Sequence, residues 1–122
     1  MKYKDILLID KLLEATLKLP MSAKIMVTLL VCKSGYTRAL SEFDARRISI
    51  INSENADEET KCNAVEKLAE SECENFTPDK VTIELFEVVL DIALKQGKIK
   101  VMGREVEVAE FAEVFYNNLV AK

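Results

Sequence analysis

Three carboxylates in the second half of the chain have the spacing that acid–base or metal chemistry would use. Glu84, Glu87 and Asp91 lie three and four residues apart, so a helix carries all three on one face. Such a face can hold a proton or a divalent ion when further ligands lie opposite it. The chain has no histidine and no second helix with matching carboxylates, which favours a hydrated surface. We predict no catalytic residue, no metal and no cofactor.

The three cysteines, Cys32, Cys62 and Cys73, have no Cys-x-x-Cys spacing. Without histidine, the usual zinc sites and the serine and cysteine triads lack their parts. Cys62 and Cys73 occur in an apolar series at helical spacing, which favours small core residues over redox or catalytic roles. The sequence therefore predicts a protein that is not an enzyme.

Charge is unevenly distributed along the 122 residues, whose net charge is −4. Residues 1–52 hold nine Lys and Arg against five Asp and Glu, whereas residues 53–76 hold two against eight. Direct nucleic-acid binding is not expected, because a phosphate backbone is recognised by a continuous basic face. Arg46 and Arg47 could bind a phosphate, but such a pair more often lies on a helix exterior or contacts acidic residues. No apolar run approaches the roughly 20 residues of a membrane span, so we expect a cytoplasmic protein without a membrane partner.

The apolar spacing predicts a mainly helical chain. An amphipathic helix over residues 3–19 carries Leu8, Leu12, Ala15 and Leu19 on one stripe and ends at Pro20. From residue 25 to residue 50, apolar positions recur in steps of three and four, close to the heptad pattern of a coiled coil. One long helix over about 22–51 is the preferred interpretation, although glycine at position 35 could divide it in two.

A third helix is expected to begin at Asp57 and to pack antiparallel on the long one. Its inner stripe has these members: Cys62, Val65, Ala69, Cys73 and Phe76. The next helix covers residues 85–94 and starts either at Thr77-Pro78 or, if residues 80–83 are extended, at Thr82. A last helix covers residues 109–121. Five residues on the stripes of the first three helices are expected to be largely buried: Leu12, Leu29, Phe43, Val65 and Phe76.

A β-hairpin separates the last two helices. Ile99 and Val101 alternate with lysines, and Val106 and Val108 alternate with glutamates. A two-residue turn at Gly103-Arg104 pairs Val101 with Val106 and Ile99 with Val108, which puts all four on one face. The predicted fold is thus a helical bundle with a long helical hairpin over residues 1–76, followed by an α-β-β-α subdomain over residues 77–122. The two parts pack as one compact domain.

The heptad seam predicts more apolar helix surface than one short partner helix covers, which favours self-association or docking on a larger protein. The expected interaction residues lie on the long helix and on the hairpin: Tyr36, Phe43, Arg46, Arg47, Ile99, Val101, Val106 and Val108. The open edges of the hairpin could accept a strand from a neighbouring chain. The alternative is a small acidic regulator that covers a nucleic-acid-binding partner with the acidic face of residues 54–74.

The order of elements also resembles a family of small accessory proteins encoded in the structural gene clusters of tailed bacteriophages. The similarity rests on a leading helix, the LPMSAK link, the residues Phe43, Asp44, Arg46 and Arg47 on a long helix, and an acidic helix ending near Phe76. It covers roughly residues 1–80, and the C-terminal hairpin is more elaborate than the family pattern. The resemblance implies a structural or assembly role in the virion or the infected cell and carries no catalytic residues across.

Overall fold

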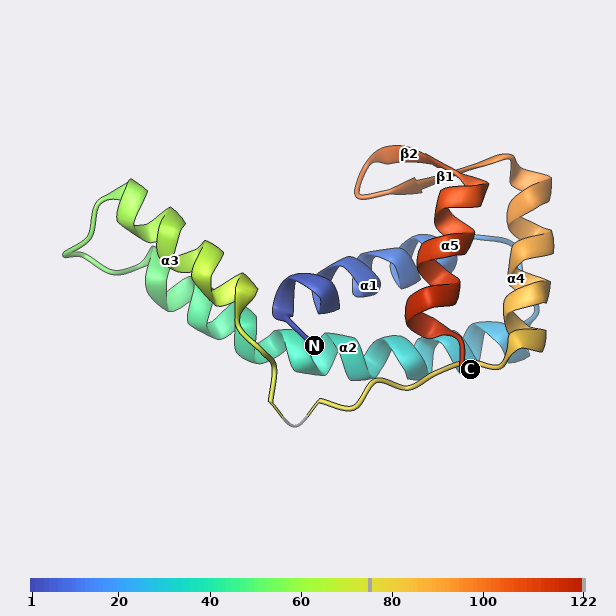
Figure 1. The fold of residues 1–122 in the computed structure, drawn as a ribbon, viewed down its shortest axis with the longest axis horizontal. Helices are drawn as coiled ribbons and strands as arrows, with labels where there is room; N and C mark the ends of the chain where they lie inside the picture. The colour runs from blue at the N-terminus through green and yellow to red at the C-terminus, as the bar shows by residue number, and fades with distance from the viewer. Residues whose placement is uncertain (75, 122) are drawn as a thin grey trace.

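The computed structural model describes residues 1–74 and 76–121, and these residues form five helices and one two-stranded sheet (Figure 1). In chain order the elements are α1 (Tyr3–Thr16), α2 (Ala23–Ile51), α3 (Glu58–Glu70), α4 (Ile83–Gln96), β1 (Lys98–Val101), β2 (Arg104–Glu107) and α5 (Val108–Leu119). The predicted class, mainly helical with one C-terminal hairpin followed by a helix, is confirmed. The expectations for Asn75, in the third helix, and for Lys122, at the end of the last subdomain, lie outside the described residues. Within those residues, no helix combines the length and the apolar character that crossing a bilayer requires.

The first helix buries one broad face and ends before the predicted boundary. It stops at Thr16, whose hydroxyl donates to the Leu12 carbonyl at 2.8 Å, and the chain reaches Leu19 through turns. Leu12, Ala15 and Leu19 are buried as expected. Leu8 is 45% exposed, contrary to its predicted place on the buried stripe, because the packed face is centred on Ile6, Ile9 and Leu13 and leaves Leu8 at its edge.

The long helix is continuous, so Gly35 does not divide α2. The Ser22 hydroxyl caps its start by accepting from the Ile25 amide at 3.4 Å. Five seam positions are buried: Leu29, Cys32, Tyr36, Leu40 and Phe43. Their packing on both sides of Gly35 outweighs the roughly 1 kcal/mol by which a helical glycine is less favourable than alanine.

The third helix begins as predicted, with the Asp57 carboxylate accepting from the Thr60 amide at 2.8 Å, but it ends at Glu70. Cys73 and Phe76 therefore do not continue its stripe. Instead the chain runs back beside the start of α1, where Lys2 and Glu72 form an isolated antiparallel bridge. Cys62 is exposed, contrary to its predicted core position, because α3 packs mainly on α2 and on α1 and no residue of α3 is fully buried.

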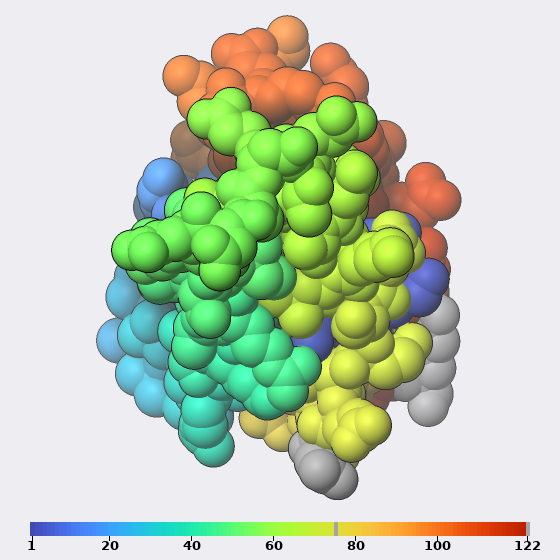
Figure 2. Space-filling model, turned by 90° about the vertical axis from the view of Figure 1, so that its left-hand side faces the viewer, coloured from blue at the N-terminus to red at the C-terminus, as the bar shows by residue number. Residues whose placement is uncertain are grey.

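Together with the C-terminal half of α2, α3 extends away from the other helices as a two-helix projection (Figure 1). We call residues 44–70 the arm and the remaining elements the body. Seen from the free end of the arm, the residues around 50–60 stand in front of the rest of the molecule (Figure 2). The long helix thus spans both regions, so any partner that lies along α2 contacts both.

The C-terminal elements form a second layer beside α1. Thr82 caps α4, and its hydroxyl accepts from the Leu85 amide at 3.2 Å, so the interpretation with an extended segment before Thr82 is confirmed. Val81 in that segment pairs in parallel with Val120. Helices α4 and α5 lie side by side (Figure 1), with the Phe86 and Phe115 rings stacked at 5.5 Å. Gly97, at φ 84°, ends α4.

The hairpin is present, but its predicted register is wrong. Ile99 pairs with Val106, and Val101 pairs with Arg104. The turn consists of Met102 and Gly103, with φ of 55° and 78°, so it needs two left-handed residues and not the predicted Gly103-Arg104 pair. A shift of two residues preserves the facing of side chains, so Ile99, Val101 and Val106 remain buried. Val108 leaves the sheet and becomes the half-buried first residue of α5.

Helix α1 lies at the centre of the core and contacts α2, α3, β1 and α5. The hairpin packs on its flanking helices α4 and α5, and β1 also packs on α1. The expected burial of Leu12, Leu29 and Phe43 is confirmed. Residues 71–74 and 76–82 run beneath α2 (Figure 1), and we call them the segment beneath α2. Val65 and Phe76 are only half-buried because the arm and this segment are each covered on one side.

Candidate interaction surfaces

The aromatic residues that the sequence assigned to docking belong to the core of this chain. Tyr36 has no exposed surface, and its ring meets the edge of Phe76 at 5.2 Å. Phe43 is 6% exposed and packs against Tyr3 at 5.4 Å. A partner that approaches the folded chain would therefore touch neither ring.

The two arginines form pairs within their own helix. Arg46 donates to Glu42 at 2.6 Å, and Arg47 lies 3.7 Å from Asp44. The sequence left open a helix exterior or a contact with the acidic third helix, and no ion pair in the described part of the chain joins either arginine to α3. The residues that hold the end of α3 are instead N-terminal, because Lys2 and Lys4 both pair with Glu70.

The apolar face of the hairpin is also internal, since Ile99, Val101 and Val106 are buried and Val108 is half-buried. The edges of the hairpin, unlike its apolar face, are open. Among the described residues, no backbone–backbone hydrogen bond joins residues 98–107 to an element outside the hairpin. Strand addition at these edges stays a prediction. The buried side chains of Val101 and Val106 would lie beneath the sheet and would not contact an added strand at its edge.

Two buried polar groups of α2 are unsuited to nucleophilic chemistry. Burial raises the pKa of the Cys32 thiol to about 11, and the thiol donates to the Asp79 carbonyl at 3.3 Å. Burial also raises the pKa of the Tyr36 hydroxyl far above its ordinary value of 10.0, and this oxygen has no hydrogen-bond partner among the described residues. Both groups therefore stay protonated at neutral pH, and a protonated thiol is a poor nucleophile.

The surface that the sequence analysis missed is the outer face of α2. Its members repeat the steps of the buried seam, displaced by two residues, and all are exposed: Ala23, Val27, Leu30, Ser34, Thr37, Ser41, Ala45 and Ile48. We call these eight residues the outer stripe. Val27 is 58% exposed, Leu30 48% and Ile48 50%, and the adjacent Val31 is 59% exposed. None of the eight is charged, which is unusual for the solvent side of an amphipathic helix.

A polar cluster decides which face of α2 points outward. The Asp10 carboxylate, 7% exposed as a residue, accepts from the Lys33 ammonium at 3.1 Å and from the Thr37 hydroxyl at 3.0 Å. The two donors lie one helical turn apart on α2. Thr37 is exposed at the edge of the outer stripe nearest α1, and its hydroxyl is turned toward Asp10. Rotating α2 to bury the outer stripe would break both bonds and leave a carboxylate without partners, which is unfavourable.

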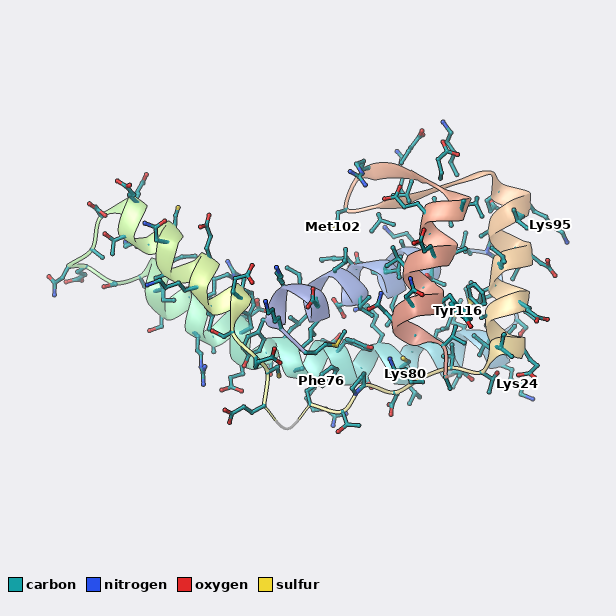
Figure 3. All side chains as sticks on the ribbon, in the orientation of Figure 1. Lys24, Phe76, Lys80, Lys95, Met102 and Tyr116 are labelled. Carbon is teal, nitrogen blue, oxygen red and sulfur yellow. The ribbon has the colours of Figure 1, made fainter. Side chains whose placement is uncertain are left out.

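Charge separates the two ends of α2. The free end of the arm carries Glu54, Glu58 and Glu59, and none of them has an ion pair in the described part of the chain. Near the start of α2, Lys18 and Lys24 are exposed and likewise unpaired among the described residues. Figure 3 shows Lys24 at the end of the molecule opposite the arm.

A second apolar surface is a groove of about 300 Å³ between α1, the hairpin and α5. Leu8, Met102 and Val114 line it, and an ion pair between Arg104 and Glu110 at 3.4 Å lies beside them. Figure 3 shows Met102 at the tip of the hairpin, and Met102 is 66% exposed. Leu8 is exposed because it lines this groove. The charged residues of the groove, Arg104 and Glu110, already pair with each other.

The carboxylates considered first, Glu84, Glu87 and Asp91, all lie on the exposed side of α4. Within residues 1–74 and 76–121, no three Cys, Asp or Glu side chains are grouped so that they could hold a metal ion. Comparisons with models of protein families, with curated proteins and with solved structures find no match to this chain.

Proposed function

We propose that this protein is a non-enzymatic interaction or assembly protein that docks through the outer stripe of α2. The observation that carries the proposal is an uncharged face with exposed Val27, Leu30 and Ile48 along a helix that spans the body and the arm. Contiguous apolar surface on a small protein commonly marks a protein-binding site. The Asp10 cluster supports the same role, because it holds this face outward rather than allowing α2 to turn it into the core.

A photo-crosslinking residue at Val31 tests this role in the cells that make the protein. Leu94 on α4 provides the matched control, since both side chains are 59% exposed. We expect a discrete crosslinked product from position 31 and none from position 94. Equal yields from both positions, or none from either, would contradict docking through α2. A product of two copies and a product with a different protein both agree with the proposal.

The biological setting that we propose is a tailed bacteriophage, as a virion-associated or assembly component. The support is the resemblance in element order over residues 1–80, in which the long helix and the acidic helix after it are the main features. The genes beside this one and the protein content of purified virions test the setting. Neighbours unrelated to virion structure, together with absence from both virions and infected cells, would refute it.

A second candidate function is an acidic regulator that covers a basic, nucleic-acid-binding protein. The observation in its favour is that Glu54, Glu58 and Glu59, at the free end of the arm, have no ion pair with any described residue. Such a complex would weaken with salt, because exposed charges are screened. Changing the three glutamates to lysine should abolish it, whereas Leu30→Glu should leave it intact. The opposite pattern would favour docking through the outer stripe.

A further inference from the structure

We propose that the partner of the outer stripe is a second copy of this chain, bound antiparallel along α2. This inference rests on the proposed docking role of the stripe and names its occupant. The stripe extends over 23–48, about 38 Å of helix at 1.5 Å per residue, and its steps of three and four match the spacing of a two-helix seam. The argument for a second copy is self-complementarity in side-chain size and in charge.

Side-chain size is complementary when the two-fold axis lies level with Gly35 and Tyr36. Residue numbers then run in opposite directions along the two helices, and each large residue meets a small one. Leu30 lies opposite Ser41 of the second copy, and Ile48 lies opposite Ala23. Val27 lies level with Asp44 and one residue from Ala45, and Ser34 lies level with Thr37 beside the axis. Alternation of large and small residues across a helix pair allows close packing.

Charge is complementary in the same arrangement. The C-terminal end of α2 extends about one turn beyond the start of the other α2, which brings the tip of each arm to the opposite end of its partner. Glu54, Glu58 and Glu59 then approach Lys18 and Lys24 of the second copy, and none of these five groups forms an ion pair with another described residue of its own chain. The acidic tip also meets the helix start, whose dipole is positive and whose first turn carries no acidic residue.

A parallel pair lacks both features. It would place Leu30 on Leu30 and Ile48 on Ile48, and it would bring the two acidic tips together and the two sets of lysines together. Like charges placed side by side oppose association and exclude wrong arrangements. The alternating sizes and the separated charges therefore specify one direction of pairing.

Light scattering and single-cysteine crosslinking test the inference on the full chain. Cys62 is first changed to serine because it is the exposed native cysteine among the described residues. We expect twice the mass of one chain at micromolar concentration, and Leu30→Glu should raise the dissociation constant at least about tenfold, or about 1.4 kcal/mol. Thr28→Glu is the matched control, because position 28 is exposed but lies on the other side of the helix from Leu30. Circular dichroism checks that both variants stay helical.

The direction of pairing is read from a short bismaleimide crosslinker. Ser34→Cys should crosslink to its own counterpart, and a mixture of Ala23→Cys and Ile48→Cys should give a mixed product. Ala23→Cys alone should give none, since its two copies lie about 38 Å apart along an antiparallel pair. A product from Ala23→Cys alone would overturn the antiparallel arrangement, and a monomer at every concentration would overturn the dimer. With a monomer, crosslinking of Val31 to another protein would still uphold docking through α2.

Discussion

The body and the arm are built from the same kinds of helix but bury very different amounts of them. In the body, α5 buries Phe111, Phe115 and Leu119, and its neighbours are α4, α1 and both strands. In the arm, α3 has a good cap and an amphipathic sequence, yet no residue of it is fully buried. The comparison shows that the number of elements around a helix, and not its own pattern, decides how much tertiary packing stabilises it.

The largest expected effect comes from truncating the centre of the body. Phe115 has no exposed surface and touches both Phe86 and Phe111. Phe115→Ala should lower the free energy of unfolding by about 3–5 kcal/mol, because it removes buried area and leaves a cavity. Val65→Ala in the arm should lower it by only about 1 kcal/mol, since Val65 is half-buried. Urea unfolding measures both, and similar losses would show that the arm is packed as tightly as the body.

The next effect concerns the polar cluster that joins α1 to α2. Lys33→Met removes the ammonium from Asp10 and leaves that nearly buried carboxylate with the Thr37 hydroxyl. The expected loss is about 1–3 kcal/mol, because an unpaired buried group bears its desolvation penalty. The double variant with Asp10→Leu should recover part of this loss. If the single variant is as stable as the original chain, the cluster does not hold α2 in position.

A smaller effect, of opposite sign, is expected at Tyr36. Its hydroxyl is buried without a partner among the described residues, so removing the oxygen relieves a desolvation penalty. Tyr36→Phe should keep the ring contact with Phe76 and change the free energy of unfolding by less than about 1 kcal/mol, toward greater stability. A clear destabilisation, measured in the same urea series, would mean that the hydroxyl is hydrogen-bonded in solution.

The smallest effect is a pH dependence at the junction of arm and body. A hydrogen bond from Lys4 holds the pKa of Glu70 below its ordinary 4.5, and the Met1 α-amino group does the same for Glu72. Carboxyl groups whose pKa is lowered by folding stabilise the fold above about pH 4.5. They lose that effect as the pH falls through their pKa in the folded state. Lys4 has a raised pKa because it donates to Glu70, so its share is lost only at high pH.

Hydrogen exchange monitored by NMR can detect this loss. Amides near the end of α3 should lose protection on acidification before amides of α5 do. Glu70→Gln should reduce the pH dependence at these amides, since glutamine cannot titrate. If amides of α3 and α5 lose protection at the same pH, both in the original chain and in the Glu70→Gln variant, the arm does not open separately from the body.

Much of the fold followed from local signals in the sequence. The caps at Ser22, Asp57 and Thr82 and the turn glycine at position 97 mark helix boundaries by hydrogen bonding and backbone geometry. The continuity of α2 through Gly35 followed from the seam on both sides of it. These features depend on neighbours in sequence, so a pattern of residue types is enough to predict them.

The errors concern choices that depend on distant neighbours. The hairpin register depends on whether Met102 adopts a left-handed φ. The face pattern could not decide the register, because both registers place Ile99, Val101 and Val106 on the same face. The exposure of Cys62 depended on which elements lie against α3. The outer stripe was visible as the seam displaced by two residues, but its small side chains resembled an ordinary solvent face. The structure made it a candidate by showing that about half of each of Val27, Leu30 and Ile48 stays exposed.

The segment beneath α2 gives the molecule a defined mechanical response. Its first residues hold the start of the chain, through bonds from the Tyr3 amide to Ser71 and from the Cys73 amide to Met1. Its last residues hold the other end, through bonds from the Val81 amide to Leu119 and from the Ala121 amide to Val81. A pulling force between residues 1 and 121 would therefore load these two small patches, at the first residue of α1 and the last residue of α5, before the rest of either helix. The chain would therefore begin to unfold under force at these two patches, one beside the arm and one beside α4 and α5.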